Sequence, residues 1–284
     1  MQRYLQYVFL FCSLILLSSC NKDKLKAPES AFLVTAPVTL TTTPAQGSNS
    51  QKITDIWYYV NGQFKGIFPI GNVMPVVASG NAEITLFAGI KNNGISATRL
   101  PYPFYNSITY NQNFEPGKTY TISPVFQYNT GAYFYYFDNF DSVVGGGSYF
   151  VSNGATSYSN TASFDPTKSF EGAGSIYMTM SDAHPNAEML QTIPYFLPSG
   201  GATIYLELNY KCNQPFTVGV IGGGSDRRTA LTVNTSNEWN KIYVQLSSVV
   251  STQPTYSSYQ VFIHADKTVA SPEIYIDNVK LIYQ

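Results

Sequence analysis

Charge is scarce in this sequence. Its 284 residues include 16 Lys and Arg and 17 Asp and Glu, which is 12% of the chain and leaves a net charge of −1. Nucleic-acid-binding proteins usually present a basic surface, so this balance argues against a nucleic-acid partner. Aromatic residues, in contrast, make up 15% of the chain. So many rings with so little net charge exclude bulk disorder.

Residue types that carry catalysis are also few. The two histidines, His184 and His264, lie in different segments, and neither belongs to a His-Glu-x-x-His or Cys/His zinc spacing. The sequence has no Gly-x-Ser-x-Gly elbow. The glycine-rich stretch 222–228 lacks the Gly-Lys-Ser/Thr of a phosphate-binding loop. We therefore predict no catalytic residue, although paired carboxylates for glycoside hydrolysis stay open as an alternative.

The three cysteines indicate no internal disulfide. Cys12 lies within an apolar run near the N-terminus, and Cys20 lies three residues after the end of that run at Leu17. Cys212 ends the stretch 204–212, in which every even position is apolar or aromatic. This period of two places Cys212 on the buried side of a strand, as a core thiol rather than a nucleophile.

The N-terminus has the features of an export signal. Its apolar run, Val8 to Leu17, is shorter than the ~20 residues that span a bilayer. The next residues, Leu17-Ser18-Ser19-Cys20, resemble the bacterial lipobox. The resemblance implies that residues 1–19 are a lipoprotein signal peptide and that Cys20 takes the acyl chains, palmitate among them, that anchor the protein to a membrane. An ordinary signal peptide or a short anchor helix is the alternative.

Residues 20–30 form a polar tether. Its Lys22-Asp23 pair resembles the charged tracts that direct Bacteroidetes lipoproteins to the cell surface. The resemblance implies an outer-membrane, lipid-anchored protein that faces the outside of the cell.

Residues 31–128 are predicted to form a first β domain. Strands are expected near 31–34, 53–60, 63–68, 82–89 and 119–122, and Asn61-Gly62 supplies a tight hairpin turn. The stretch 59–63, with Gly66, Pro69 and the turn 115–118, resembles small Ig-like or PEGA-like surface modules and the N-terminal half of uncharacterised Bacteroidetes lipoproteins. The resemblance implies an Ig-like β-sandwich.

Residues 129–284 are predicted to form a second β domain with strands near 133–137, 175–180, 203–212, 217–221, 241–246, 259–264 and 273–283. Four segments, 137–141, 169–175, 238–241 and 274–281, resemble carbohydrate-binding-module jelly rolls of the galactose-binding-like type. The overall fold expected is all-β, an Ig-like sandwich followed by a jelly roll, with a polysaccharide or cell-surface glycan as partner.

A structural calcium ion is implied by the same resemblance. In such modules the ion ties the first strand to the last, and calcium prefers oxygen ligands. The matching carboxylates here are Asp138, Asp141, Glu171 and Asp277. The alternative is that these carboxylates cap turns or pair with Lys168 and Lys280.

The strand patterns also suggest a glycan-binding face. Alternation places one polar or aromatic set opposite the core positions of the strands near 203–212, 241–246 and 259–264: Tyr205, Glu207, Asn209, Tyr243, Gln245, Gln260, Phe262 and His264. Rings stack on sugars, and amides, carboxylates and imidazole bind hydroxyl groups. If the three strands share a sheet, these side chains form one surface. A loop rim near Tyr149, Phe150, Tyr195 and Phe196 is the alternative site.

Three functions remain open. The first is a non-catalytic, surface-displayed, glycan-binding lipoprotein. The second is a structural or adhesion component of an outer-membrane protein complex, which the ring-rich patch 100–105 would serve if exposed. Such prolines and rings also close domain interfaces. The third is a glycoside hydrolase or lyase.

Lipidation of Cys20 is directly testable. The change Cys20→Ala should move the protein from the detergent phase to the aqueous phase of metabolically labelled cells, because the acyl chains provide the membrane affinity. Unchanged partitioning would contradict the lipobox prediction.

Overall fold

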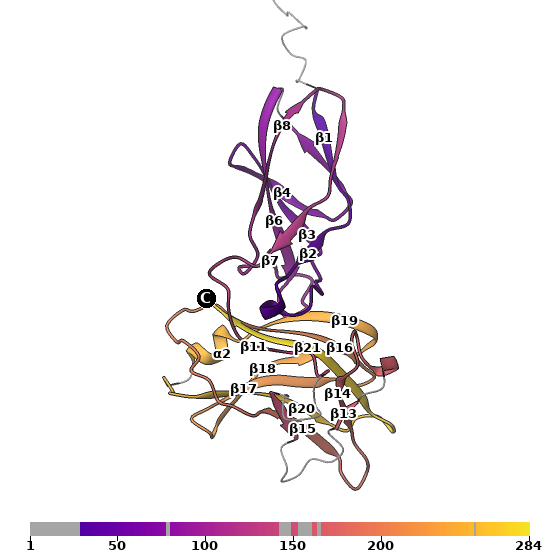
Figure 1. Ribbon diagram of the computed structural model, residues 1–284, viewed down its shortest axis with the longest axis vertical. Coiled ribbons are helices and arrows are strands. Elements are labelled where there is room, and N and C mark those ends of the chain that lie inside the picture. The colour runs from indigo at the N-terminus through magenta and orange to yellow at the C-terminus, as the bar shows by residue number, and fades with distance from the viewer. Residues whose placement is uncertain (1–28, 78–79, 142–148, 153–160, 164–165, 253) are drawn as a thin grey trace, which may run out of the picture.

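The computed structural model describes residues 29–77, 80–141, 149–152, 161–163, 166–252 and 254–284. Within them the chain forms two β domains, and the N-terminal domain stands with one end on the broad face of the C-terminal domain (Figure 1). The predicted signal peptide, Cys20 and most of the predicted tether lie outside the described residues. In the part described, no helix is long and apolar enough to cross a membrane.

The N-terminal domain is a β-sandwich. Its strands are β1 (Ala31–Thr35), β2 (Thr39–Thr41), β3 (Asp55–Val60), β4 (Gln63–Pro69), β5 (Val73–Val76), β6 (Gly80–Lys91), β7 (Arg99–Pro101), β8 (Ile108–Phe114), β9 (Thr119–Ile122) and β10 (Val125–Gln127). One layer holds the sheet β5-β1-β9 and the parallel pair β10-β2, and the other holds β4-β3-β6-β7 with β8 also paired to β6. Both layers contribute to one core.

Local sequence explains the central hairpin of this domain. Ile56, Tyr58 and Val60 alternate along β3 and are buried, because successive strand residues point to opposite faces. Asn61 and Gly62 both have positive φ, 49° and 72°, as a two-residue turn of this kind requires. The predicted hairpin from 53 to 68 is therefore confirmed.

The C-terminal domain is a jelly-roll sandwich, so the all-β prediction is confirmed. Its strands are β11 (Tyr133–Asp138), β12 (Phe150–Ser152), β13 (Thr161–Ser163), β14 (Ser175–Thr179), β15 (Asn186–Gln191), β16 (Ile204–Cys212), β17 (Phe216–Gly222), β18 (Asp226–Val233), β19 (Ser236–Gln245), β20 (Tyr259–Asp266) and β21 (Glu273–Tyr283). Its short helical turns are η3 (Pro166–Lys168) and α2 (Ser247–Ser251), and η2 (Pro44–Gln46) belongs to the other domain.

Two sheets enclose the core of this second domain. The sheet that faces the N-terminal domain runs β13-β14-β21-β16-β19, with β11 also paired to β21, and the far sheet runs β12-β15-β20-β17-β18. We call them the near sheet and the far sheet (Figure 1). Cys212 is 2% exposed within the core, as predicted, and burial raises the pKa of its thiol.

Candidate functional site

Five of the predicted glycan-binding residues share one face, as alternation required. Tyr205, Glu207 and Asn209 on β16 lie beside Tyr243 and Gln245 on β19, with Tyr205 opposite Gln245 and Glu207 opposite Tyr243. The N-terminal domain covers this face, and Tyr205, Glu207, Asn209 and Tyr243 are each no more than 2% exposed. The prediction of an open sugar surface here is therefore wrong, because a second domain occupies it.

Aromatic rings from the segment 100–105 make this cover. The Tyr102 ring lies 4.7 Å from that of Tyr243 and 5.4 Å from that of Tyr205, centroid to centroid. Phe104 contacts Tyr205 as well, at 5.9 Å. Such tilted and edge-to-face pairs contribute favourable energy beyond the area they bury. The ring-rich patch is thus the domain interface, the second of the two roles that the sequence left open.

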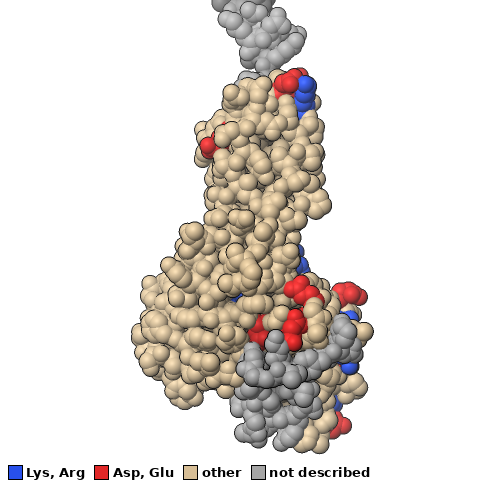
Figure 2. All heavy atoms as spheres, in the orientation of Figure 1, with Lys and Arg blue, Asp and Glu red and all other residues tan. Residues whose placement is uncertain are grey.

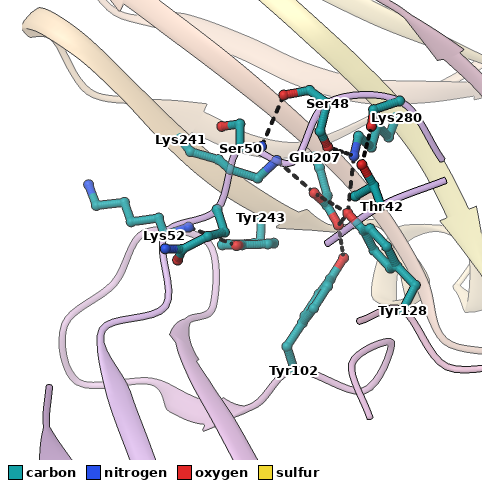
Figure 3. A network of polar contacts seen from close by, with 12 residues as sticks. Thr42, Ser48, Ser50, Lys52, Tyr102, Tyr128, Glu207, Lys241, Tyr243 and Lys280 are labelled. Carbon is teal, nitrogen blue, oxygen red and sulfur yellow. Dashed lines mark hydrogen bonds and ion pairs between the residues drawn. The ribbon is translucent and has the colours of Figure 1, made fainter. Parts of the chain in front are cut away.

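A buried carboxylate lies at the centre of the interface (Figure 3). Glu207 is fully buried, and the Lys241 ammonium lies 2.7 Å from its Oε2 atom. The Tyr102 and Tyr128 hydroxyls of the N-terminal domain donate to Oε1 at 2.8 and 2.9 Å. Lys280, also fully buried, donates to the Ser48 carbonyl and to the Tyr128 hydroxyl.

Electrostatics keep this carboxylate ionised. Burial alone would raise the pKa of Glu207, but Lys241 and Lys280 outweigh burial and lower it. The same burial, together with repulsion from Lys241, lowers the pKa of Lys280 to about 7. The network therefore holds one negative charge between two amines, with hydroxyl donors from the opposite domain completing its hydrogen bonds.

Backbone and amide contacts fix the rest of the interface. The Asn93 amide donates to the Tyr243 carbonyl at 3.0 Å, and the Gln245 amide donates to Asn93 Oδ1 at 2.8 Å. The Tyr205 hydroxyl donates to Asn92 Oδ1 at 3.0 Å. Directional contacts of this kind add orientation to the aromatic packing, so one relative placement of the domains is favoured.

The interface depends on Glu207. The change Glu207→Ala should lower the free energy of unfolding by about 3–5 kcal/mol, because Lys241 would remain buried without its partner. Chemical denaturation measures the loss. The variant Glu207→Gln keeps the shape of the side chain and can still accept hydrogen bonds from the tyrosine hydroxyls. Its free energy of unfolding should therefore lie between those of the parent and of Glu207→Ala.

A matched control is Glu115→Ala, which removes a carboxylate paired with Lys118 on the surface. An exposed ion pair contributes little, so this variant should unfold as the parent does. If Glu207→Ala and Glu115→Ala lowered the free energy of unfolding equally, a central role for the buried network would be contradicted.

The other three predicted glycan residues lie on the far sheet. Gln260, Phe262 and His264 belong to β20, which pairs with β15 and β17 and not with β16 or β19. The single surface expected from the sequence therefore does not exist. Any role of these three residues in binding stays a prediction.

Phe262 is not available for stacking, because a cation covers it. The Arg227 guanidinium lies 3.5 Å from the centre of its ring, and the ring is 1% exposed. Gly219 leaves room for the Phe262 ring, since a Cβ at Gly219 would come within 2.5 Å of the ring.

Arg227 in turn pairs with Glu188, which also lies 3.1 Å from His264 Nδ1. The hydrogen bond to Glu188 raises the pKa of His264 against the effect of burial.

The loop rim proposed as an alternative sugar site is mostly packed. Phe150 is buried, the Tyr149 ring stacks on Tyr136 at 4.9 Å, and the Tyr195 ring lies 4.9 Å from Tyr135. Phe196 alone of the four is more than half exposed.

Three of the four predicted calcium ligands, Asp138, Asp141 and Asp277, accept hydrogen bonds from the backbone, and the backbone amide of the fourth, Glu171, donates to Asp277. Asp138 accepts from the Phe140 and Tyr149 amides. Asp141 and Asp277 hold opposite ends of the loop 170–174, Asp141 through the amides at 173–174 and Asp277 through those at 170–171. Burial raises the pKa of Asp277 to about 7, although these amides oppose the shift.

These contacts match the turn-capping alternative. Among the residues with assigned positions, no group of three or more His, Cys, Asp or Glu is arranged to hold a metal. Calcium also takes backbone carbonyl ligands, so its binding stays a prediction. Bound calcium should raise the unfolding midpoint of the C-terminal domain, and EDTA should lower it, in a calorimetric scan. A midpoint that responds to neither would contradict the calcium prediction.

One exposed face of the N-terminal domain gathers aromatic rings that sequence reasoning missed. We call Trp57 and Tyr59 on β3, Phe64 on β4 and Phe87 on β6 the aromatic strip. Their ring centroids are 5.3–5.5 Å apart, from Trp57 to Phe64, Phe64 to Tyr59 and Tyr59 to Phe87. Phe64 is 49% exposed. The alternation along β3 could have revealed these rings from the sequence, because Trp57 and Tyr59 lie on the opposite side of the strand from the buried Ile56 and Tyr58.

A polar hollow continues the same face. Phe87, Thr85 and Glu83 alternate on one side of β6, and Thr109 and Asn111 lie opposite Thr85 and Glu83 on β8. The hollow has a volume of about 470 Å³ and is lined by carboxamides and one carboxylate: Asn61, Asn81, Glu83, Asn111, Gln112 and Asn113. We call it the amide hollow. Its volume lies within the ~300–1,000 Å³ typical of small-molecule sites.

The side chains on this face suit a neutral polar ligand that also has apolar patches. Amide groups both donate and accept hydrogen bonds, and a carboxylate accepts them. Aromatic faces favour flat apolar C–H surfaces. Figure 2 shows few charged side chains on the N-terminal domain in its orientation, with Lys, Asp and Glu mostly at the end far from the jelly roll.

No protein-family model matches the sequence, and no curated protein matches it. Among solved structures, the chain is similar to a family 61 carbohydrate-binding module in complex with β-1,4-galactotriose, at 11% identity and a TM-score of 0.32, covering 46% of this chain and 85% of that one. A mutant family 29 module complexed with mannohexaose gives 10% identity and a TM-score of 0.38, over 53% and 92% of the two chains. Values this low do not assign a ligand to this chain.

Proposed function

We propose that this chain is a non-catalytic glycan-binding lipoprotein, anchored through Cys20 at the outer membrane and facing the cell surface. The observation that carries the proposal is the aromatic strip beside the amide hollow on one exposed sheet face. The glycan site thus lies on the N-terminal domain rather than on the jelly-roll residues predicted from the sequence.

The strip supplies the apolar part of recognition. Sugar rings present C–H groups on their faces, and Tyr59 and Phe64 offer ring surface on neighbouring strands. Both rings belong to paired strands, so little conformational entropy is lost when a ligand docks.

The amide hollow supplies the polar part. Glu83 and Asn111 lie opposite each other in register, and Asn61 Oδ1 accepts from the Glu83 amide at 2.9 Å, which fixes the hairpin against β6. Sugar hydroxyls both donate and accept, which matches a mixture of carboxamide and carboxylate groups. Among the described residues that line the hollow, Glu83 is the one carboxylate, whereas glycoside hydrolysis uses a pair. This supports binding rather than catalysis.

The jelly roll then serves as a platform. Its near sheet holds the N-terminal domain through the Glu207 network and the Tyr102 contacts. The strip lies on β3, β4 and β6 and supplies no residue to the Glu207 network or to the Tyr102 contacts described above. A ligand can therefore reach its exposed ring, Phe64, while the domains stay joined.

A structural or adhesion role in an outer-membrane protein complex is the second candidate. Phe64 and Ile67, 49% and 39% exposed, give the strip the apolar character of a protein-binding patch. The two candidate functions can be distinguished, because binding of a protein partner would not require a glycan.

The experiment measures retention on immobilised polysaccharides by affinity electrophoresis, after an array has identified a glycan that the parent binds. The double change Tyr59→Ala with Phe64→Ala should weaken binding at least tenfold, which corresponds to about 1.4 kcal/mol, because two stacking surfaces are removed. Near-parent folding is checked by the unfolding midpoint.

Phe196→Ala is the matched control, since it removes an exposed ring from the other domain. It should bind as the parent does. Absence of any bound glycan, or full retention of the double variant, would reject the proposed site.

A further inference from the structure

A second cavity lies where the two domains meet. It has a volume of about 100 Å³, and both domains line it: Lys52, Thr54 and Lys91 from one, and Tyr210, Asn240 and Lys241 from the other. The Glu207 network lies directly behind it, since Lys241 belongs to both. The aromatic strip and the amide hollow have no residue in common with it.

Positive charge dominates this cavity. Three of its lining residues are lysines, and no Asp or Glu is found among the described residues that line it. Two carboxylates beside the lining residues are already paired, Glu207 with Lys241 and Asp55 with Arg99.

Lys241 contributes positive charge from behind the cavity wall. Its side chain is 2% exposed, and its ammonium is paired with Glu207.

Lys52 adds a cation at the rim of the cavity. Its backbone amide donates to the Tyr243 hydroxyl at 3.0 Å, and its ammonium contacts Asn240 Oδ1 (Figure 3 shows Lys52, Tyr243 and Lys241). Burial and then repulsion from Lys91 lower the pKa of Lys52. An anion placed among these lysines would relieve that repulsion.

The size of the cavity limits what can enter. The cavity volume is about 100 Å³. This is well below the ~300 Å³ of the smallest usual ligand pockets. A single ionised group fits, whereas a whole sugar unit does not.

We propose that this junction cavity binds one oxyanion, a carboxylate or a sulfate group, beside Lys52 and Lys91. The group is either a free inorganic anion or the acidic substituent of a sugar. The site needs both domains, since Tyr210 and Asn240 of the jelly roll complete its lining. It goes beyond the glycan surface proposed above and does not depend on it.

Titration calorimetry with the full chain tests the site, at constant ionic strength with chloride as the background. The probes are inorganic sulfate, galacturonate and, as the uncharged comparison, galactose. If the site takes only a free anion, sulfate should bind and galacturonate should not. If it also takes the acidic group of a sugar, both should bind. Galactose should not bind at this site.

The test variant is the double change Lys52→Gln with Lys91→Gln, which leaves the buried Lys241–Glu207 pair intact. It should weaken anion binding at least tenfold without lowering the unfolding midpoint. The control is Lys65→Gln with Lys118→Gln, two exposed lysines remote from the cavity, which removes the same charge. The control should bind as the parent does.

Two outcomes would overturn the proposal. One is that neither sulfate nor galacturonate binds the parent. The other is that both double variants lose anion binding equally, which would show that binding depends on the net charge of the protein and not on this site. Because the Tyr59 and Phe64 variant leaves these lysines untouched, loss of glycan retention there with anion binding preserved separates the two sites.

Discussion

A single buried carboxylate organises the molecule. Glu207 lies on the jelly roll, yet two of its hydrogen-bond donors, Tyr102 and Tyr128, belong to the other domain. An ionised group in such surroundings is tolerated only when its partners are complete. Because those partners come from both domains, separating the domains would leave Glu207 without its Tyr102 and Tyr128 donors. This couples the two sandwiches more tightly than apolar contact alone, which would permit sliding.

Periodicity predicted the faces of strands but not what lies against them. The alternation along β16 correctly placed Tyr205 and Glu207 opposite the core positions, and Cys212 within the core. The same mixture of rings and polar groups suits both a sugar site and an interface between domains, since each joins apolar packing to directed hydrogen bonds. Deciding between them required knowing where residues about 100 positions earlier in the chain lie. No local pattern contains that information.

The missed elements have a similar explanation. Strand β18 carries Asp226, Arg227 and Arg228 at its start, and β15 begins in a stretch that looks like a polar loop, so neither has the apolar alternation of a half-buried strand. Both gain their place from pairing with neighbours, β17 and β20. The aromatic strip could have been predicted, because Trp57 and Tyr59 alternate with buried residues along β3. Its neighbour Phe64 could not, since a bulge in the β3–β4 ladder decides which way that ring points.

The last strand of the chain has a bearing on how the protein reaches its folded state. Ile282, two residues from the C-terminus, is fully buried and belongs to the hydrophobic core of the N-terminal domain, as do Tyr205 and Tyr243. Chains are synthesised from the N-terminus, and domains generally fold as they emerge. Here Tyr102 and Phe104 of the first domain stay uncovered until β16 and β19 have formed, because Tyr205 and Tyr243 cover them. Strands of the second domain therefore complete the burial of the first.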